Sequence, residues 1–290
     1  MATAQQWLSA SRPRTLPAAV APVLAGAGAA FAIGAFSWWK SLLALLVSLA
    51  LQVGVNYSND YSDGIRGTDE VRVGPMRLVG SGAASPAQVR SAAFGCLAVA
   101  GVAGLVLAAV TTWWLLPFGA AAVAAAWFYT GGLKPYGYAG FGEIFVFLFF
   151  GLLAVLGTTY VNSARVTYPA VAAAVGIGLL ACALLMVNNL RDVATDTVSG
   201  KRTLAVLLGD RLARLVLVST VGGAFLAVLV LGLAQPWCLL ALLSAPLAIA
   251  PLRRVLRGDH GVALLKALGA VGRLEFVYAV LITAGLMLGR

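Results

Sequence analysis

Charge is what this chain of 290 residues has least of. Asp, Glu, Lys and Arg make up 10% of it, whereas a soluble domain carries about 25%. A soluble core of this size would need far more polar surface, so the composition excludes that class. Histidine occurs once, at His260, which excludes a histidine-based metal site. The three cysteines lie within apolar runs without metal-ligand spacing, and we expect Cys96, Cys182 and Cys238 to pack as small hydrophobic side chains.

Long apolar runs are what the chain has in abundance. It is 61% hydrophobic, with a mean hydropathy of +0.94. Runs of about 20 apolar residues recur along it, which is typical of membrane-spanning helices. We therefore predict an all-α polytopic membrane protein, a single domain over residues 1–290, with about nine transmembrane helices in one bundle. The expected spans are 16–36, 41–58, 91–112, 115–130, 142–161, 168–188, 212–233, 236–252 and 272–289.

The basic residues indicate how these spans are oriented. With the N-terminus in the cytoplasm, all 20 Lys and Arg residues except Lys40, Arg165 and Arg290 fall on the inner side. All ten Asp and Glu residues lie on that side or at its edge. We therefore expect a cavity that faces the cytoplasm. The net charge of +10 suits an anionic inner leaflet or a polyanionic substrate. It does not indicate nucleic acid, because the basic residues are scattered through short loops.

Two short stretches resemble each other at the ends of long apolar runs. Residues 56–63 are NYSNDYSD, and residues 188–196 are NNLRDVATD. Each begins Asn-x-x-x-Asp and has a second Asp three or four residues later. On a continuing helix these positions line one face. The members of the two motifs are Asn56, Asp60 and Asp63 in the first and Asn188, Asp192 and Asp196 in the second, with Asp69 beyond the first.

Closely spaced carboxylates repel each other unless a cation lies between them. Mg²⁺ takes oxygen ligands, and in proteins it usually binds one or two carboxylates together with substrate phosphates. Both motifs also lie at helix C-terminal ends, where the dipole favours cations. We therefore predict that the motifs face each other and hold two Mg²⁺ ions bridged by a diphosphate. Candidates for contacts to the remaining phosphate oxygens are Arg66, Arg72, Arg77, Lys134, Arg191 and Lys201.

A simpler interpretation exists for each of these residues. Carboxylates near arginine are often solvated ion pairs that contribute little stability. Two matched motifs at membrane depth favour a site, because charge there is costly. Tyr129 ends a span beside the predicted site, and it is either an interfacial anchor or a substrate contact. We expect Glu143 to favour the start of its helix and His260 to lie on the surface.

With these motifs in view, the chain resembles the UbiA-type superfamily of intramembrane aromatic prenyltransferases over nearly its whole length. The superfamily pattern Asn-Asp-x-x-Asp-x-x-x-Asp is matched at Asn59, Asp60 and Asp63, but the next acid, Asp69, comes two positions late. The pattern therefore does not assign Asp69 a metal role. That departure is similar to one branch, the 1,4-dihydroxy-2-naphthoate polyprenyltransferases of menaquinone synthesis. Segments that also resemble this branch are 11–17, 74–77, 129–132, 141–143, 188–192 and 200–204.

The resemblance implies an enzyme in the plasma membrane of a bacterium. It would transfer a polyprenyl group from a polyprenyl diphosphate to 1,4-dihydroxy-2-naphthoate, with loss of CO₂ and diphosphate, giving demethylmenaquinone. Mg²⁺ bound by Asp60, Asp63, Asp192 and Asp196 would stabilise the leaving diphosphate. Lys134 and Lys201 would contact that diphosphate, and Lys134 or Arg77 would meet the acceptor carboxylate.

Three alternatives follow from the same residues. In the first alternative, the protein is an enzyme of the same superfamily whose acceptor is another phenolic acid, such as 4-hydroxybenzoate or homogentisate. A CDP-alcohol phosphotransferase also uses membrane-edge Asp residues and a metal, but its Asp-Gly-x-x-Ala-Arg pattern is absent. A transporter would carry charges in the middle of its spans, whereas nearly all charges here lie at the edges.

Overall fold

The computed structural model describes residues 2–67 and 76–290, so Asp69 and Arg72 lie outside the described residues. The described chain is built from helices: α1 (Ala4–Ala10), η1 (Pro13–Thr15), α2 (Pro17–Ala32), α3 (Trp38–Ile65), α4 (Pro86–Val110), α5 (Leu115–Phe128), η2 (Tyr136–Ala139), α6 (Gly142–Val146), η3 (Phe147–Leu153), α7 (Ala154–Ser163), α8 (Tyr168–Val198), α9 (Leu204–Gly232), η4 (Pro236–Ser244), α10 (Ala245–Leu256), η5 (Gly261–Ala263) and α11 (Leu264–Leu288). Segment η3 is a π-helix that joins α6 to α7 in one continuous rod.

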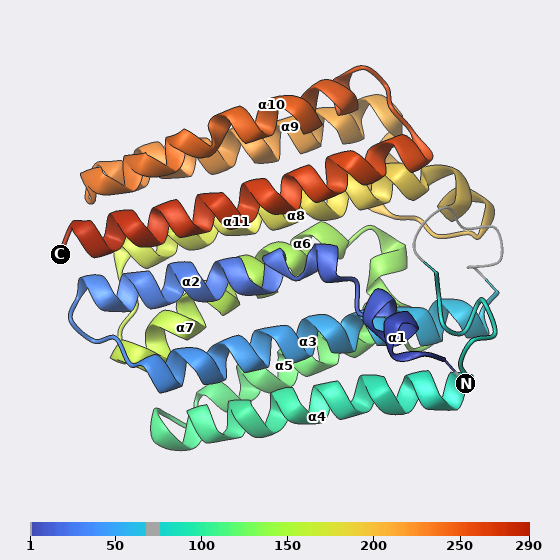
Figure 1. Ribbon diagram of the computed structural model, residues 1–290, viewed down its shortest axis with the longest axis horizontal. Coiled ribbons are helices and arrows are strands. Elements are labelled where there is room, and N and C mark those ends of the chain that lie inside the picture. Colours follow the sequence, from blue (N-terminus) through green and yellow to red (C-terminus); the bar gives the residue numbers. More distant parts are fainter. Residues whose placement is uncertain (1, 68–75) are drawn as a thin grey trace.

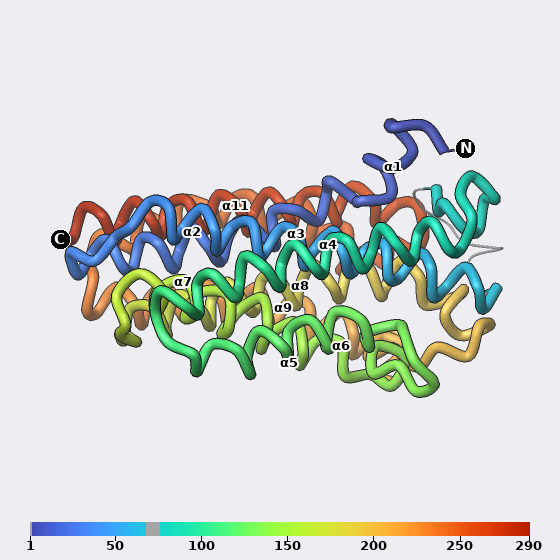
Figure 2. The backbone as a smooth tube through the Cα atoms, turned by 90° about the horizontal axis from the view of Figure 1, so that it is seen from below, coloured from blue at the N-terminus to red at the C-terminus, as the bar shows by residue number. Residues whose placement is uncertain are grey.

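The long helices run side by side along one axis, in a single bundle (Figures 1 and 2). The N-terminus lies at one end, together with the C-terminal ends of α3 and α8, and the C-terminus lies at the other end (Figure 1). This arrangement confirms the predicted all-α polytopic membrane fold.

The predicted count of nine spans is not confirmed. Within the described residues, seven helices are long and apolar enough to cross a membrane, and the bent pair Ala4–Thr15 and Pro17–Ala32 makes eight. The span expected at 115–130 is α5, with 14 residues. A helix of that length rises about 21 Å, less than the roughly 30 Å hydrocarbon core. It ends before Gly131-Gly132, where Gly132 takes a left-handed φ of 76°.

Helix α8 is the centre of the bundle. Of its most apolar window, 78% is buried, against 28–50% for the other six membrane-length helices. Small residues let its neighbours approach closely, because a Cβ on Gly151 of η3 would lie 2.6 Å from the Cα of Gly178 on α8. Tyr278 of α11 passes Gly176 of α8 and donates its hydroxyl to the Ala224 carbonyl of α9 at 2.7 Å. These contacts fix α8 between three helices.

Both Asp motifs are helical in the structure. Helices α3 and α8 continue to Ile65 and Val198, past the ends at 58 and 188 that the apolar pattern predicts. Each motif therefore forms the last turns of a long, well-packed helix, and its side chains take fixed directions.

Candidate active site

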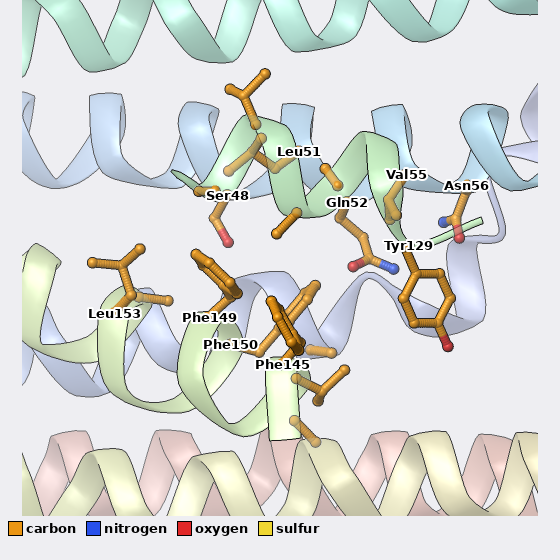
Figure 3. Close-up of a pocket in the computed structure, with 18 of the residues that line it drawn as sticks. Ser48, Leu51, Gln52, Val55, Asn56, Tyr129, Phe145, Phe149, Phe150 and Leu153 are labelled. Carbon is orange, nitrogen blue, oxygen red and sulfur yellow. The ribbon is translucent and has the colours of Figure 1, made fainter. Parts of the chain in front are cut away.

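A cavity of about 880 Å³ runs along the inside of the bundle. Its lining on α3 extends from Ala44 to Asp63, which is about 28 Å of helix. One end is polar, and the remainder is lined by aliphatic and aromatic side chains. Figure 3 shows the middle of the cavity, where Phe145, Phe149 and Phe150 face Leu51 across the space. A cavity with one polar end and a long apolar body suits an amphiphilic ligand.

The first motif places Asp63 at the polar end. Its carboxylate accepts from the Tyr138 hydroxyl and lies 3.0 Å from Lys201 Nζ and 3.4 Å from an Arg77 nitrogen. Asn56 also lines the cavity, and its Nδ2 donates to the Ser11 carbonyl at 2.9 Å. From the end of α3, Asp63 thus contacts residues of η2, of the loop before α4 and of the loop after α8.

Asp60 differs from the sequence-based expectation. Its side chain is fully buried and does not line the cavity. Its two carboxylate oxygens accept from the backbone N–H groups of Leu78 and Val79, at 2.8 and 3.0 Å. In this structure Asp60 fastens the loop before α4 to helix α3, so its metal role stays a prediction.

The second motif faces the same polar end from α8. Asn188, Asp192 and Asp196 all line the cavity. The Asp192 carboxylate pairs with Arg191, whose Nε and terminal nitrogen lie 2.7 and 2.5 Å from its oxygens. The backbone N–H of Lys201 donates to the Asp196 carbonyl at 2.8 Å. The fold therefore brings the two motifs to one cavity, as the sequence predicts.

The predicted basic residues divide into two groups. Arg77 and Lys201 line the cavity, whereas Lys134 is exposed and does not. Arg66 is also exposed, and its guanidinium donates to the Thr130 and Gly132 carbonyls. Arg191 does not line the cavity, and its guanidinium forms an ion pair with Asp192. A lysine or arginine at the right sequence position can point into the cavity or away from it, and only packing decides which.

Tyr129 lines the same cavity as Asn56 (Figure 3). Tyr136 and Tyr138 line it as well. Burial raises the pKa of Tyr138 above its usual range, and the negative charge of Asp63 adds to the effect. The Tyr138 phenol therefore keeps its proton and serves as a donor at the polar end.

Sequence reasoning assigned no role in the site to three further polar residues of the cavity wall. Asn59 lies inside the first motif and accepts from the Thr130 hydroxyl at 2.8 Å. Asn189 lies inside the second, and its position on the motif helix is the signal that would have found it. Arg12 reaches the cavity from the turn between α1 and η1, with a left-handed φ of 54° that is unusual for a side chain of this size.

Residues 19–286 match the UbiA prenyltransferase family. This chain belongs to the UbiA prenyltransferase family. Curated relatives extend the likeness to the whole chain. A 1,4-dihydroxy-2-naphthoate octaprenyltransferase from Mycobacterium tuberculosis is 51% identical over 290 residues, covering 100% of this chain and 99% of the relative. An enzyme of the same description from Escherichia coli is 36% identical, covering 90% of this chain and 88% of the relative.

Solved UbiA structures share the fold. A UbiA homologue from Archaeoglobus fulgidus, bound to DMAPP and Mg²⁺, superposes with a TM-score of 0.67 at 18% identity, over 96% of this chain and 99% of that one. The apo structure of a UbiA homologue from Aeropyrum pernix also gives 0.67, at 16% identity over 93% and 97%. The UbiA bundle is therefore the architecture of this chain.

The donor chemistry of the cavity fits magnesium. The polar end presents carboxylates of Asp63, Asp192 and Asp196 and side-chain amides, and among the described residues no Cys or His lines it. Such an oxygen-only set suits a hard cation. Across residues 2–67 and 76–290, no three His, Cys, Asp or Glu side chains gather closely enough to hold a metal by themselves. Mg²⁺ usually binds one or two carboxylates together with substrate phosphates, and Asp63, Asp192 and Asp196 are the carboxylates that line this cavity.

Proposed function

We propose that this UbiA-family protein transfers a polyprenyl group from a polyprenyl diphosphate to 1,4-dihydroxy-2-naphthoate. The reaction releases diphosphate and CO₂ and gives the reduced form of demethylmenaquinone, a menaquinone precursor. The observation that carries the proposal is the cavity, which joins two facing carboxylate motifs to an apolar interior. The descriptions of the curated relatives supply the acceptor.

The polar end binds the diphosphate in this proposal. Asp63, Asp192 and Asp196 would hold Mg²⁺, as two ions, with Asp60 as a further ligand if its loop contact opens. Bound Mg²⁺ supplies positive charge that stabilises the leaving diphosphate. Lys201 and Arg77 line the same end and bind phosphate oxygens directly.

The bond changes follow from this arrangement. The allylic C–O bond of the donor breaks, and its electron pair leaves with the diphosphate. The naphthoate ring supplies the electron pair for the new C–C bond. The bond between the ring and its carboxylate carbon then breaks, and the carboxylate leaves as CO₂. The electron pair of that bond returns to the ring. The rings of Tyr136 and Phe145 stack with centroids 4.0 Å apart, and both line the cavity. In this proposal they keep water from the allylic cation.

Several further statements belong to the same proposal. The cavity draws its lining from helices α2 to α8 and from α11, so the chain acts as one domain. The protein resides in the bacterial plasma membrane, with its N-terminus and the polar end of the cavity facing the cytoplasm. The positive-inside distribution of Lys and Arg supports this orientation.

The test is reconstitution. We expect purified protein in detergent, given Mg²⁺, octaprenyl diphosphate and 1,4-dihydroxy-2-naphthoate, to form the prenylated naphthoquinol and CO₂. Asp192→Asn should lose at least about a hundredfold in activity, as expected when a main electrostatic contact is removed. Asp259→Asn, which alters a partly exposed ion pair with Arg254, is the matched control and should remain active. Prenylation of 4-hydroxybenzoate alone would assign another acceptor, and activity without Mg²⁺ would contradict the metal role.

A further inference from the structure

Glu143 is a buried carboxylate that the reaction above does not use. It begins the α6–η3–α7 rod, where the sequence indicates only a favourable helix start. Its side chain is 8% exposed and does not line the cavity. Instead it reaches α8, where its Oε1 accepts from Nδ2 of Asn189 at 2.8 Å.

The backbone at this position is held firmly against α8. The Cys182 thiol donates to the Glu143 carbonyl at 3.2 Å. A Cβ on the preceding Gly142 would come within 3.2 Å of the Leu185 side chain, so glycine permits this close approach. Glu143 is therefore fixed relative to the helix that carries the second Asp motif.

The hydrogen bond determines which atom Asn189 presents to the cavity. In the structure Glu143 is the acceptor of this bond, so the NH₂ of Asn189 is turned toward Glu143. Asn189 lines the cavity three residues before Asp192, and its NH₂ is the amide group that Glu143 engages. Without Glu143 the amide can rotate and place its NH₂ toward the cavity, where a cation would be repelled.

We propose that Glu143 is a positioning residue, which holds Asn189 with its amide oxygen toward the bound magnesium diphosphate. The inference rests on the proposed function, since it assigns a partner to the same metal site. The arrangement is of the kind seen around metal ligands, where an outer carboxylate orients an inner side chain, and its loss weakens metal binding about 10- to 100-fold.

The experiment measures binding rather than turnover. Full-length protein in detergent is titrated with inorganic diphosphate in the presence and absence of Mg²⁺ by calorimetry, and thermal unfolding is followed in parallel. We expect Glu143→Met to weaken Mg²⁺-dependent binding by roughly tenfold or more. Glu275→Met is the matched control, because Glu275 is a fully buried carboxylate outside the cavity wall, and its binding should equal that of the wild type.

A double variant that exchanges the carboxylate of Glu143 and the amide of Asn189 distinguishes a positioning role from a packing role. Asn189→Asp alone sets two carboxylates against each other and should bind poorly. Adding Glu143→Gln gives the aspartate a donor, leaves an oxygen toward the cavity, and should restore most of the affinity. A merely structural Glu143 would not give this rescue, and the pair remains informative if Glu143→Met does not fold.

Each result has a distinct meaning. Wild-type affinity in Glu143→Met, or no rescue in the double variant, would overturn the positioning role while leaving the proposed function intact. Diphosphate binding by the wild type that does not depend on Mg²⁺ would instead remove the metal-dependent function, and this inference with it.

Discussion

Asp60 and Asp63 show how differently two residues of one motif are used. They lie three positions apart on α3, yet Asp63 opens on the cavity while Asp60 accepts from two backbone amides and is fully buried. The difference arises because the loop before α4 folds back over one side of the helix. A motif defines residue types and spacing, but the neighbouring loop decides which carboxylate faces the ligand.

At this scale we expect Asp60→Asn to destabilise the protein as well as affect activity. An asparagine accepts from only one of the two amides of Leu78 and Val79 and turns an NH₂ toward the other. A buried group left unsatisfied costs about 1–3 kcal/mol. The measurement is the thermal unfolding midpoint in detergent, with Asp259→Asn as the control. An inactive Asp60→Asn protein with an unchanged midpoint would show that the loop contact contributes little stability and that Asp60 acts mainly at the metal.

Between elements, close packing of α8 holds the site in place. The η3 segment approaches α8 until Gly151 and Gly178 are in backbone contact, and Phe147 lies against Gly178. The same rod carries Glu143 at its start and the cavity phenylalanines beyond it. The small residues that pack these helices thus also set the distance between the cavity wall and the second Asp motif.

Gly151→Ala tests this contact. The added Cβ would lie 2.6 Å from the Cα of Gly178, so the helices must move apart. Overpacking of this kind costs about 1–3 kcal/mol. Gly95→Ala on α4 meets nothing within 4 Å and should be neutral or slightly stabilising. Unfolding midpoints of the two variants in the same detergent give the comparison. Equal midpoints would mean that the bundle adjusts at this crossing without cost.

For the whole molecule, the length of the cavity matches the thickness of the membrane. The lining on α3 covers about 28 Å, close to the roughly 30 Å of a hydrocarbon core. Val23, Ala44, Leu107 and Val161 pack together at the apolar end. A prenyl tail that starts at the carboxylates can therefore extend along the bundle inside protein before it reaches that end.

Substitution of Gly157 by a larger residue would reduce the volume of the apolar part of the cavity. It lines the cavity one turn before Val161, and a Cβ there meets nothing within 4 Å. We expect Gly157→Leu to fold normally and to lower kcat/KM for octaprenyl diphosphate more than for geranyl diphosphate, because only the long tail reaches this level. The measurement is a competition between the two donors, with Gly95→Leu as the control. Equal losses for both donors would indicate that the tail takes another path.

Much of the fold could be predicted because membrane chemistry restricts it strongly. In a chain so short of charge, backbone groups must be satisfied within helices, so apolar runs indicate spans directly. The exceptions are informative. The run at 115–130 gives a helix of only 14 residues, because Gly131-Gly132 follows it. The predicted spans end at residues 58 and 188, before the observed ends of α3 and α8. The helices are longer because the polar motif residues continue them into the site.

The sequence by itself determined the class of protein and the chemistry of its site. Composition required a helical membrane bundle, and matched carboxylate motifs indicated a cation-dependent site. Tertiary structure decided which side chains face the ligand. It turned Asp60 and Lys134 away from the cavity, and it brought Asn189, Tyr138 and Arg12 to it. The physical reason is that residue type and helical period are local properties, whereas the direction of a side chain depends on neighbours that are distant in sequence, as Glu143 is to Asn189.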